Sequence, residues 1–146
     1  MRKHWLKQNW SITKFIRFPQ ITLTPLQTLP IFSIDDGNIA GKILQLTFYI
    51  SAATNQIWKD TKIKIYNKNI LETEISPDDI VNGLCGGFSQ RVMYGETLQV
   101  LANKLSTTAI FLNMDFYNKI LITVTSGNGN VDFSLYGLYQ QRYYTE

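Results

Sequence analysis

The segment V-D-F-S-L-Y-G-L-Y-Q, residues 131–140, alternates apolar and polar side chains with a period of two. One face of an extended chain would carry the apolar series Val131, Phe133, Leu135, Gly137 and Tyr139. Such alternation is typical of a strand with one buried face, and the turn-forming residues 127–130 (G-N-G-N) precede it. The sequence therefore predicts a sheet protein with a central closing strand. Gly137 is expected at a bulge or at a close approach of another backbone.

The same pattern recurs along the chain at spacings of about ten residues. Residues 42–50 (K-I-L-Q-L-T-F-Y-I) predict a strand whose apolar face is Leu44, Leu46, Phe48 and Ile50. Further strands are predicted at residues 62–66, 70–75, 88–94, 97–103, 109–116 and 120–125. Turns are predicted at residues 35–38 (D-D-G-N), 67–69 (N-K-N) and 118–119 (N-K), because Gly and Asn adopt turn conformations readily.

Prolines and one capping motif complete the layout. Pro19, Pro25 and Pro30 limit residues 20–34 to short extended pieces, at 20–24 and 31–34. Residues 76–79 (S-P-D-D) combine a capping side chain, an early proline and two acids, and G-G follows at 86–87, so one short helix is predicted near residues 77–85. The prediction is an all-β antiparallel sandwich or barrel of about eight or nine strands, one domain over residues 19–146.

The N-terminal segment, residues 1–18, is set apart by its charge. Its five basic residues precede any acid, and beyond it nine basic residues face eleven acidic ones, a balance of −2. The basic side chains are interleaved with aromatic ones. The candidate assembly residues of this arm are Arg2, Lys3, Trp5, Lys7, Trp10, Lys14 and Arg17.

Three interpretations of this arm are open. It could pack on the core of its own chain and leave the basic groups in solvent. It could dock on a neighbouring subunit, with the aromatic residues as anchors. It could contact nucleic acid or an anionic membrane, although the near-neutral remainder of the chain argues against nucleic acid. Assembly is the most specific of the three hypotheses.

Sequence signals of catalysis are sparse. Cys85 is the only cysteine and His4 the only histidine, so a multi-Cys or multi-His zinc site is excluded and a Ser-His triad would have to use His4. There is no Gly-rich loop followed by Lys-Ser or Lys-Thr. We therefore expect no enzyme, no cofactor and no metal. With no apolar run of about 20 residues and no signal-peptide pattern, we expect synthesis in the cytoplasm and no transmembrane segment.

With these short strands, the basic aromatic arm and the closing G-E-T-L-Q-V (95–100) and V-D-F-S-L-Y-G-L-Y-Q, the chain resembles the single jelly-roll proteins of virus and bacteriophage particles. The last strand is also loosely similar to that of the trimeric tumour-necrosis-factor and C1q-like heads. The resemblance implies a jelly-roll sandwich and a non-enzymatic capsid, vertex, decoration or fibre-head subunit. Its partners would be copies of itself or neighbouring virion subunits, and its location the virion, with the cytoplasm as the alternative.

A second function class remains open. The same sandwich could be a module that binds a carbohydrate or another ligand, such as a glycan on a host surface, by stacking on exposed aromatic residues. The candidates for such stacking are Trp58, Tyr66 and Tyr94, although ordinary half-buried strand or loop positions would equally account for them.

Overall fold

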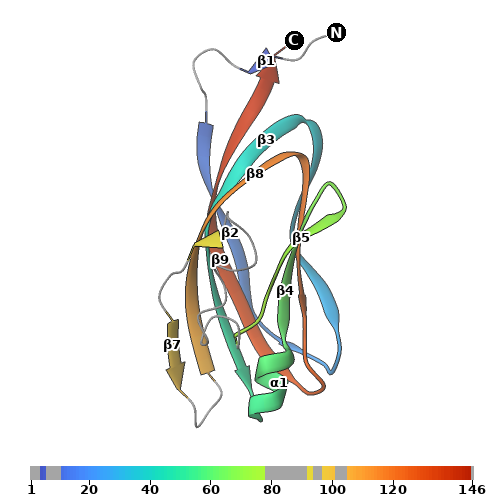
Figure 1. Cartoon of the computed structure of the whole chain (residues 1–146), viewed down its shortest axis with the longest axis vertical. Coiled ribbons are helices and arrows are strands. Elements are labelled where there is room, and N and C mark those ends of the chain that lie inside the picture. The colour runs from blue at the N-terminus through green and yellow to red at the C-terminus, as the bar shows by residue number, and fades with distance from the viewer. Residues whose placement is uncertain (1–3, 6–10, 78–91, 94–96, 101–104, 146) are drawn as a thin grey trace.

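A computed structural model describes residues 4–5, 11–77, 92–93, 97–100 and 105–145 (Figure 1). Its elements are β1 (His4–Trp5), β2 (Ser11–Leu23), β3 (Thr28–Ala52), α1 (Asn55–Asp60), β4 (Lys62–Asn67), β5 (Ile70–Ile75), β6 (Val92–Met93), β7 (Thr97–Val100), β8 (Leu105–Thr125) and β9 (Val131–Thr145). Every strand pairing in these residues is antiparallel. The predicted all-β antiparallel class is confirmed.

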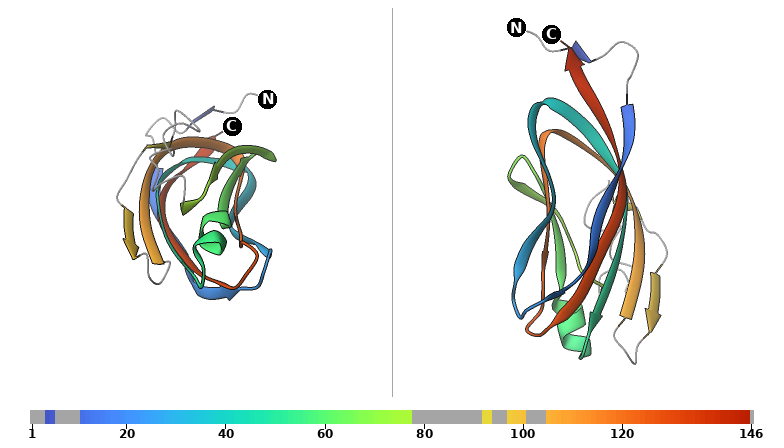
Figure 2. Two further views of the ribbon diagram at one scale, coloured as in Figure 1. Left: turned by 60° about the horizontal axis from the view of Figure 1, so that its bottom comes forward. Right: turned by 180° about the vertical axis from the view of Figure 1, so that it is seen from behind.

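Two long strands organise the sheet, which follows the order β1-β9-β3-β8-β4-β5, with β2 also on β9 and both β6 and β7 on β8. Residues 28–35 of β3 pair with the end of β8. The other edge of this part of β8 pairs with β4, and β4 pairs with β5. Residues 39–52 of β3 pair instead with the start of β8 and with β9. We call these parts the β4–β5 half and the β2–β9 half. The sheet curls so that they face each other (Figure 2).

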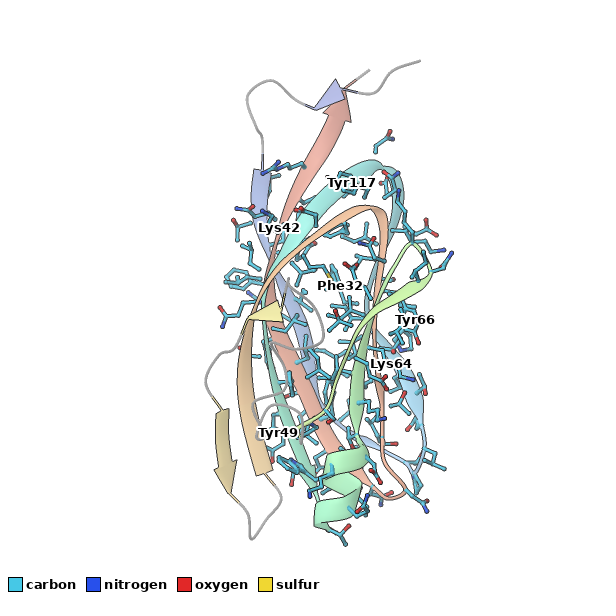
Figure 3. All side chains as sticks on the ribbon, viewed as in Figure 1. Phe32, Lys42, Tyr49, Lys64, Tyr66 and Tyr117 are labelled. Carbon is cyan, nitrogen blue, oxygen red and sulfur yellow. The ribbon has the colours of Figure 1, made fainter. Side chains whose placement is uncertain are left out.

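One core lies between the two halves. It includes Phe133 and Leu135 from β9 and Ile65 and Ile122 from the β4–β5 half, each with 0% of its surface exposed. Phe32 of the β4–β5 half lies between the two halves (Figure 3). Its ring centroid is 4.9 Å from that of Tyr139 of β9. Burial of large aliphatic and aromatic side chains from both halves is the main stabilising term available to a fold of this kind.

The predicted turns at 35–38 and 118–119 do not reverse the chain, and this part of the prediction was wrong. Asp35 is opposite Lys119 and Ala40 is opposite Tyr117. Four residues of β3, 36–39, therefore stand opposite a single residue of β8, Asn118. Asn118 has a φ of 69°, and its side-chain amide can donate to the carbonyl oxygens of residues 37 and 39, at 3.1 and 3.2 Å. Because the irregular residues are opposite one another, β3 and β8 bend together from one half into the other.

Prolines likewise shorten the strands less than predicted. β2 runs through Pro19 and β3 runs through Pro30, so the short pieces expected at 20–24 and 31–34 belong to longer strands. The pairing register shifts between Phe18 and Ile21 and between Pro30 and Phe32. Each proline therefore sits at an irregularity, where its missing N–H removes no regular ladder bond.

A bulge in β3 changes the predicted face of the strand at 42–50. The register shifts between Ile43 and Gln45, so Ile43 is buried and Leu44 is only half-buried, while Leu46 is buried as predicted. Gly137 of β9 lies beside this bulge. A β-carbon there would stand 2.6 Å from the Gln45 carbonyl oxygen. The predicted close approach at Gly137 is thus made by β3 of the same chain.

The short helix α1 was not predicted. Thr54 caps it by accepting a hydrogen bond from the Ile57 N–H at 3.3 Å, and Trp58 on the helix is 1% exposed in the core. Gly127 allows the helix to approach, since a β-carbon there would lie 2.6 Å from the Ile57 carbonyl oxygen. Of the helix predicted at 77–85, all but Pro77 lies outside the described residues, as do most of residues 88–94 and part of 97–103.

The predicted hairpin at residues 67–69 is confirmed. β4 and β5 pair antiparallel, and the two residues between them, Lys68 and Asn69, have φ values of 51° and 69°. Two consecutive positive φ values are typical of a type I′ turn, whose twist matches that of the flanking strands.

Replacement of Gly137 by alanine should destabilise the fold by about 1–3 kcal/mol, because the added methyl group meets backbone rather than a flexible side chain. Urea unfolding measures the change in free energy. Ser134→Ala, on the outer face of the same strand, is the matched control and should stay within about 0.5 kcal/mol of the parent. Equal stability of Gly137→Ala and the parent would contradict the close approach.

Candidate functional site

The residues proposed for the N-terminal arm divide between described and undescribed parts of the chain. Arg2, Lys3, Lys7 and Trp10 lie outside the described residues, and Trp5 lies in β1, opposite Tyr144 of β9. Lys14 and Arg17 lie on β2, half-buried and exposed respectively. Between them Ile16 is 3% exposed in the core. Residues 11–18 therefore form the first part of a strand that packs on its own chain.

The middle of the outer face of the β2–β9 half is poor in charge. Cross-strand pairs place Phe15 beside Leu138 and Arg17 beside Tyr136. On its other side, Tyr136 is opposite Thr47 of β3. Including their neighbours, the β2–β9 outer face comprises Thr13, Phe15, Arg17, Gln45, Thr47, Tyr49, Ser134, Tyr136 and Leu138. Arg17 is the only charged side chain among these nine. Charged residues lie at both ends of the set: Lys42 shares the row of Thr13, Arg142 lies one row further, and Asp132 lies beyond Ser134.

Two large rings dominate this face. Phe15 is 64% exposed and Tyr136 is 48% exposed. The Arg17 guanidinium carbon lies 5.1 Å from the centroid of the Phe15 ring, a distance at which cation and ring attract each other. An aromatic surface whose one charge is an arginine stacked on a ring has the composition found in the buried centre of protein interfaces.

The outer face of the β4–β5 half is different. Lys62 and Glu74 are 3.4 Å apart across β4 and β5, and Lys119 and Asp35 are 3.7 Å apart across β8 and β3. Lys64 is opposite Glu74 on the same face. We call this the charged face. Its groups are partly exposed ion pairs, which contribute little to stability and keep a surface hydrated.

The aromatic residues proposed for ligand stacking are not brought together. Trp58 is 1% exposed, so its ring has no face for a ligand, which corrects its assignment as a stacking candidate. Tyr66 is half-buried on the β4–β5 half, between Leu71 and Leu121. Tyr94 lies outside the described residues. Sequence reasoning missed Tyr117, which is 44% exposed beside the bend of β8; the adjacent Asn118-Lys119 signal pointed to that place.

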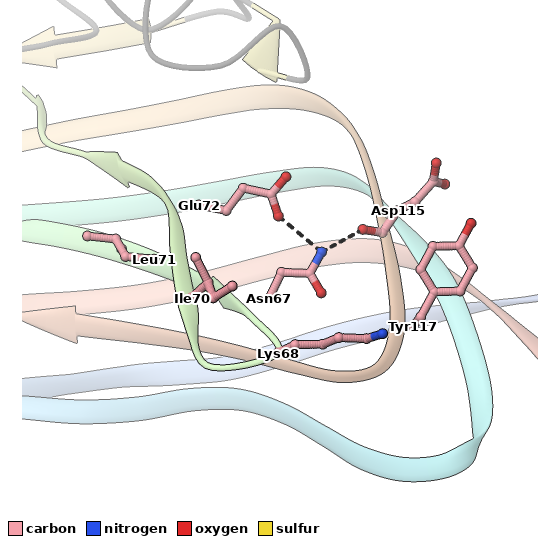
Figure 4. Close-up of a pocket in the computed structure, with 7 residues that line it drawn as sticks. All are labelled: Asn67, Lys68, Ile70, Leu71, Glu72, Asp115 and Tyr117. Atoms are coloured by element: carbon pink, nitrogen blue, oxygen red, sulfur yellow. Dashed lines mark hydrogen bonds between the residues drawn. The ribbon is translucent and has the colours of Figure 1, made fainter.

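A hollow of about 620 Å³ opens between Tyr117 and the β4–β5 hairpin (Figure 4). Its lining is Asn67, Lys68, Ile70, Leu71, Glu72, Asp115 and Tyr117. The Asn67 side-chain amide donates to Glu72 Oε2 and to the Asp115 carbonyl oxygen, both at 3.0 Å. Asn67 thus ties the hairpin to β8, and the Lys68 ammonium lies 5.9 Å from the centroid of the Tyr117 ring.

A smaller hollow of about 210 Å³ shares Tyr117 and Asp115 with the first. Tyr117, Ala40 and Arg142 occupy one row across β8, β3 and β9. Ala40, 2% exposed, forms the floor of this row between two longer, exposed side chains. Lys42 stands in the next row and lies 3.8 Å from Asp115 Oδ1.

Two further properties concern only the described part of the chain. It holds no group of three or more His, Cys, Asp or Glu side chains placed to bind a metal ion. It also holds no helix with the length and apolar character needed to cross a membrane.

No family model matches the sequence, and no curated protein is similar to it in sequence. In structure the chain is similar to the infectious bursal disease virus Gt strain (9% identity, TM-score 0.41, 92% of this chain and 32% of that chain). It is also similar to the VP2 subviral particle of that virus, with 11% identity and a TM-score of 0.41 over 92% of this chain and 33% of that chain. A third similar structure is dimeric latent PorU from Porphyromonas gingivalis, with 9% identity and a TM-score of 0.44 over 98% of this chain and 13% of that chain. The chain spans a third of these chains or less, and the similarity concerns strand arrangement alone.

Replacement of Asn67 by alanine should cost about 1–2 kcal/mol of stability, because two hydrogen bonds are lost and the Asp115 carbonyl loses its partner. Urea unfolding gives the free energy, and hydrogen exchange should show faster exchange in the β4–β5 hairpin. Asn128→Ala, at an exposed loop position, is the matched control and should be neutral. Unchanged stability together with unchanged hydrogen exchange of the hairpin in Asn67→Ala would contradict a stabilising role for the two Asn67 hydrogen bonds.

Proposed function

We propose that this protein is a structural subunit that acts by assembly and not by catalysis, as part of a virus or bacteriophage particle. The observation that carries the proposal is the middle of the β2–β9 outer face, where Phe15 and Tyr136 are exposed and Arg17 is the one charge in the rows of Phe15 and Tyr136. The jelly-roll assignment of the fold belongs to the same proposal. The partners would be further copies of this chain or neighbouring subunits of the particle.

The energetics favour contact through this face rather than through the charged face. Burying an ion pair such as Lys62–Glu74 under a partner requires removal of water from both charges, a cost that their attraction recovers only in excellent geometry. Burying Phe15 or Tyr136 releases water from apolar surface, which is favourable at about 25 cal/mol per Å². Tyr and Arg side chains are also frequent among the residues that dominate binding energy.

The N-terminal arm extends the same surface. β2 begins at Ser11 and presents Phe15 and Arg17 outward on the β2–β9 outer face. We propose that Arg2, Lys3, Trp5, Lys7 and Trp10 contribute to the same subunit contact, with the stems of the basic residues covering apolar surface.

The proposal places the chain in the virion after synthesis in the host cytoplasm, and gives it no catalytic step and no cofactor. In support, several ionisable groups of the charged face have structural partners: Lys62 pairs with Glu74 and Lys119 with Asp35. Cross-strand ion pairs of this kind account for these side chains without a reaction.

If the protein acts by assembly, we expect the purified protein to be oligomeric. A negative charge placed on the β2–β9 outer face should then lower the molar mass of the oligomer. Tyr136→Glu should shift the molar mass from light scattering towards the monomer, because each contact would have to bury a carboxylate. Lys64→Glu, a charge change on the charged face, is the matched control and should leave the mass unchanged.

Circular dichroism should show that both variants fold, since Tyr136 is 48% exposed and Lys64 is on an outer face. A strictly monomeric parent protein would overturn the proposal. So would a Tyr136→Glu variant that is as large as the parent.

A further inference from the structure

We propose that the two hollows on either side of Tyr117 form one binding site for an acidic carbohydrate. In this site the sugar ring lies against Tyr117, and its carboxylate lies between Arg142 and Lys42. This site adjoins the β2–β9 outer face, because Lys42 lies in the row of Thr13 and both Ala40 and Arg142 lie in the next row. Its binding groups are other residues than Phe15, Arg17 and Tyr136 of the proposed subunit contact.

The floor and walls of the smaller hollow follow from the strand register. Ala40 pairs with Tyr117 on one side and with Arg142 on the other, so these two side chains stand two strand spacings apart, about 10 Å. The Ala40 methyl group is short, and it lines the smaller hollow between these two longer side chains. The result is a shallow trough with an aromatic wall at one end and a guanidinium at the other.

Positive charge is available in this trough. The cross-strand neighbours of Arg142 are Ala40 and Ser11, neither of which is charged. Lys42 is 3.8 Å from Asp115 Oδ1, with the two side chains 31% and 50% exposed, and such an exposed pair is weak enough for Lys42 to engage a ligand. A carboxylate is the anion that a planar guanidinium can bind with two parallel hydrogen bonds.

The larger hollow supplies groups suited to hydroxyls and to the apolar side of a sugar. Glu72 and Lys68 present an acceptor and a donor, while Ile70 is 71% exposed and Leu71 is 45% exposed (Figure 4). Tyr117 borders both hollows, and aromatic rings combine an apolar body with a polar hydroxyl tip. A molecule that carries both hydroxyl groups and C–H faces can satisfy this lining.

The mixture of charges selects among anions. Arg142, Lys42 and Lys68 are balanced in part by Asp115 and Glu72, so the combined lining of the two hollows has a net charge of only +1. A chain of phosphates would meet both carboxylates, and like charges repel. A ligand with one carboxylate and several hydroxyls meets the cations with its charge and the carboxylates with hydrogen-bond donors.

The test is calorimetric titration of the full-length protein with sialyllactose, and with lactose, which has the same neutral sugars but no carboxylate. We expect saturable binding of sialyllactose and binding of lactose at least tenfold weaker. Arg142→Gln should lower the affinity for sialyllactose about tenfold, by the loss of one charged contact worth 1.4 kcal/mol. It should also remove the preference over lactose.

Variants at Tyr117 separate stacking from simple anion binding. Tyr117→Ala should abolish binding, and Tyr117→Phe should retain most of it, because the ring is kept. Lys64→Gln, on the charged face, should bind as the parent does. Inorganic phosphate should bind more weakly than sialyllactose and should be insensitive to Tyr117→Ala.

Three results would overturn the proposal. The first is the absence of saturable binding both to sialyllactose and to oligogalacturonate, a second acidic sugar. The second is equal affinity for sialyllactose and lactose. The third is phosphate binding as tight as that of the sugar, which would mean an anion site alone. Light scattering measures the assembly role separately, so failure here is distinguishable from failure of the assembly role.

Discussion

The continuous pairing of β3 with β8 is the constraint on which the rest of the structure depends. It runs from Thr28 opposite Thr125 to Ser51 opposite Leu105, and both strands bend at the same place. Because one ribbon serves both halves of the sheet, the halves cannot be positioned independently. The core between them, the contact of Phe32 with Tyr139 and the row of Ala40, Tyr117 and Arg142 all follow from this bend.

Much of this architecture was predictable because period-two alternation reports directly on burial. In β9, Val131, Phe133 and Leu135 are each 0% exposed, as the pattern indicates. The hairpin at Lys68-Asn69 was predictable for a similar local reason. What the pattern could not indicate was whether a turn signal reverses the chain or bends it. Residues 35–38 and Asn118 look like two separate turns, and only their pairing shows that they are one bend.

Candidate sites were less predictable than strands. Trp58 looked suitable for stacking because its residue type is, but α1 turns it into the core, where it is 1% exposed. Tyr117 could be recognised as a candidate site residue only from the strand register, which puts it in one row with Ala40 of β3 and Arg142 of β9. Both cases depend on contacts between residues far apart in sequence, which composition and periodicity do not encode. The contrast between the aromatic middle of one outer face and the ion pairs of the other likewise requires the register of several strands.

We propose the β2–β9 outer face as the contact between subunits. The most direct measurement is photo-cross-linking of the assembled protein, with a benzophenone amino acid at position 138 on that face or at position 64 on the charged face. We predict covalent links between copies from position 138 and none from position 64. Links from position 64 alone, in protein that is oligomeric, would contradict a subunit contact through the β2–β9 outer face.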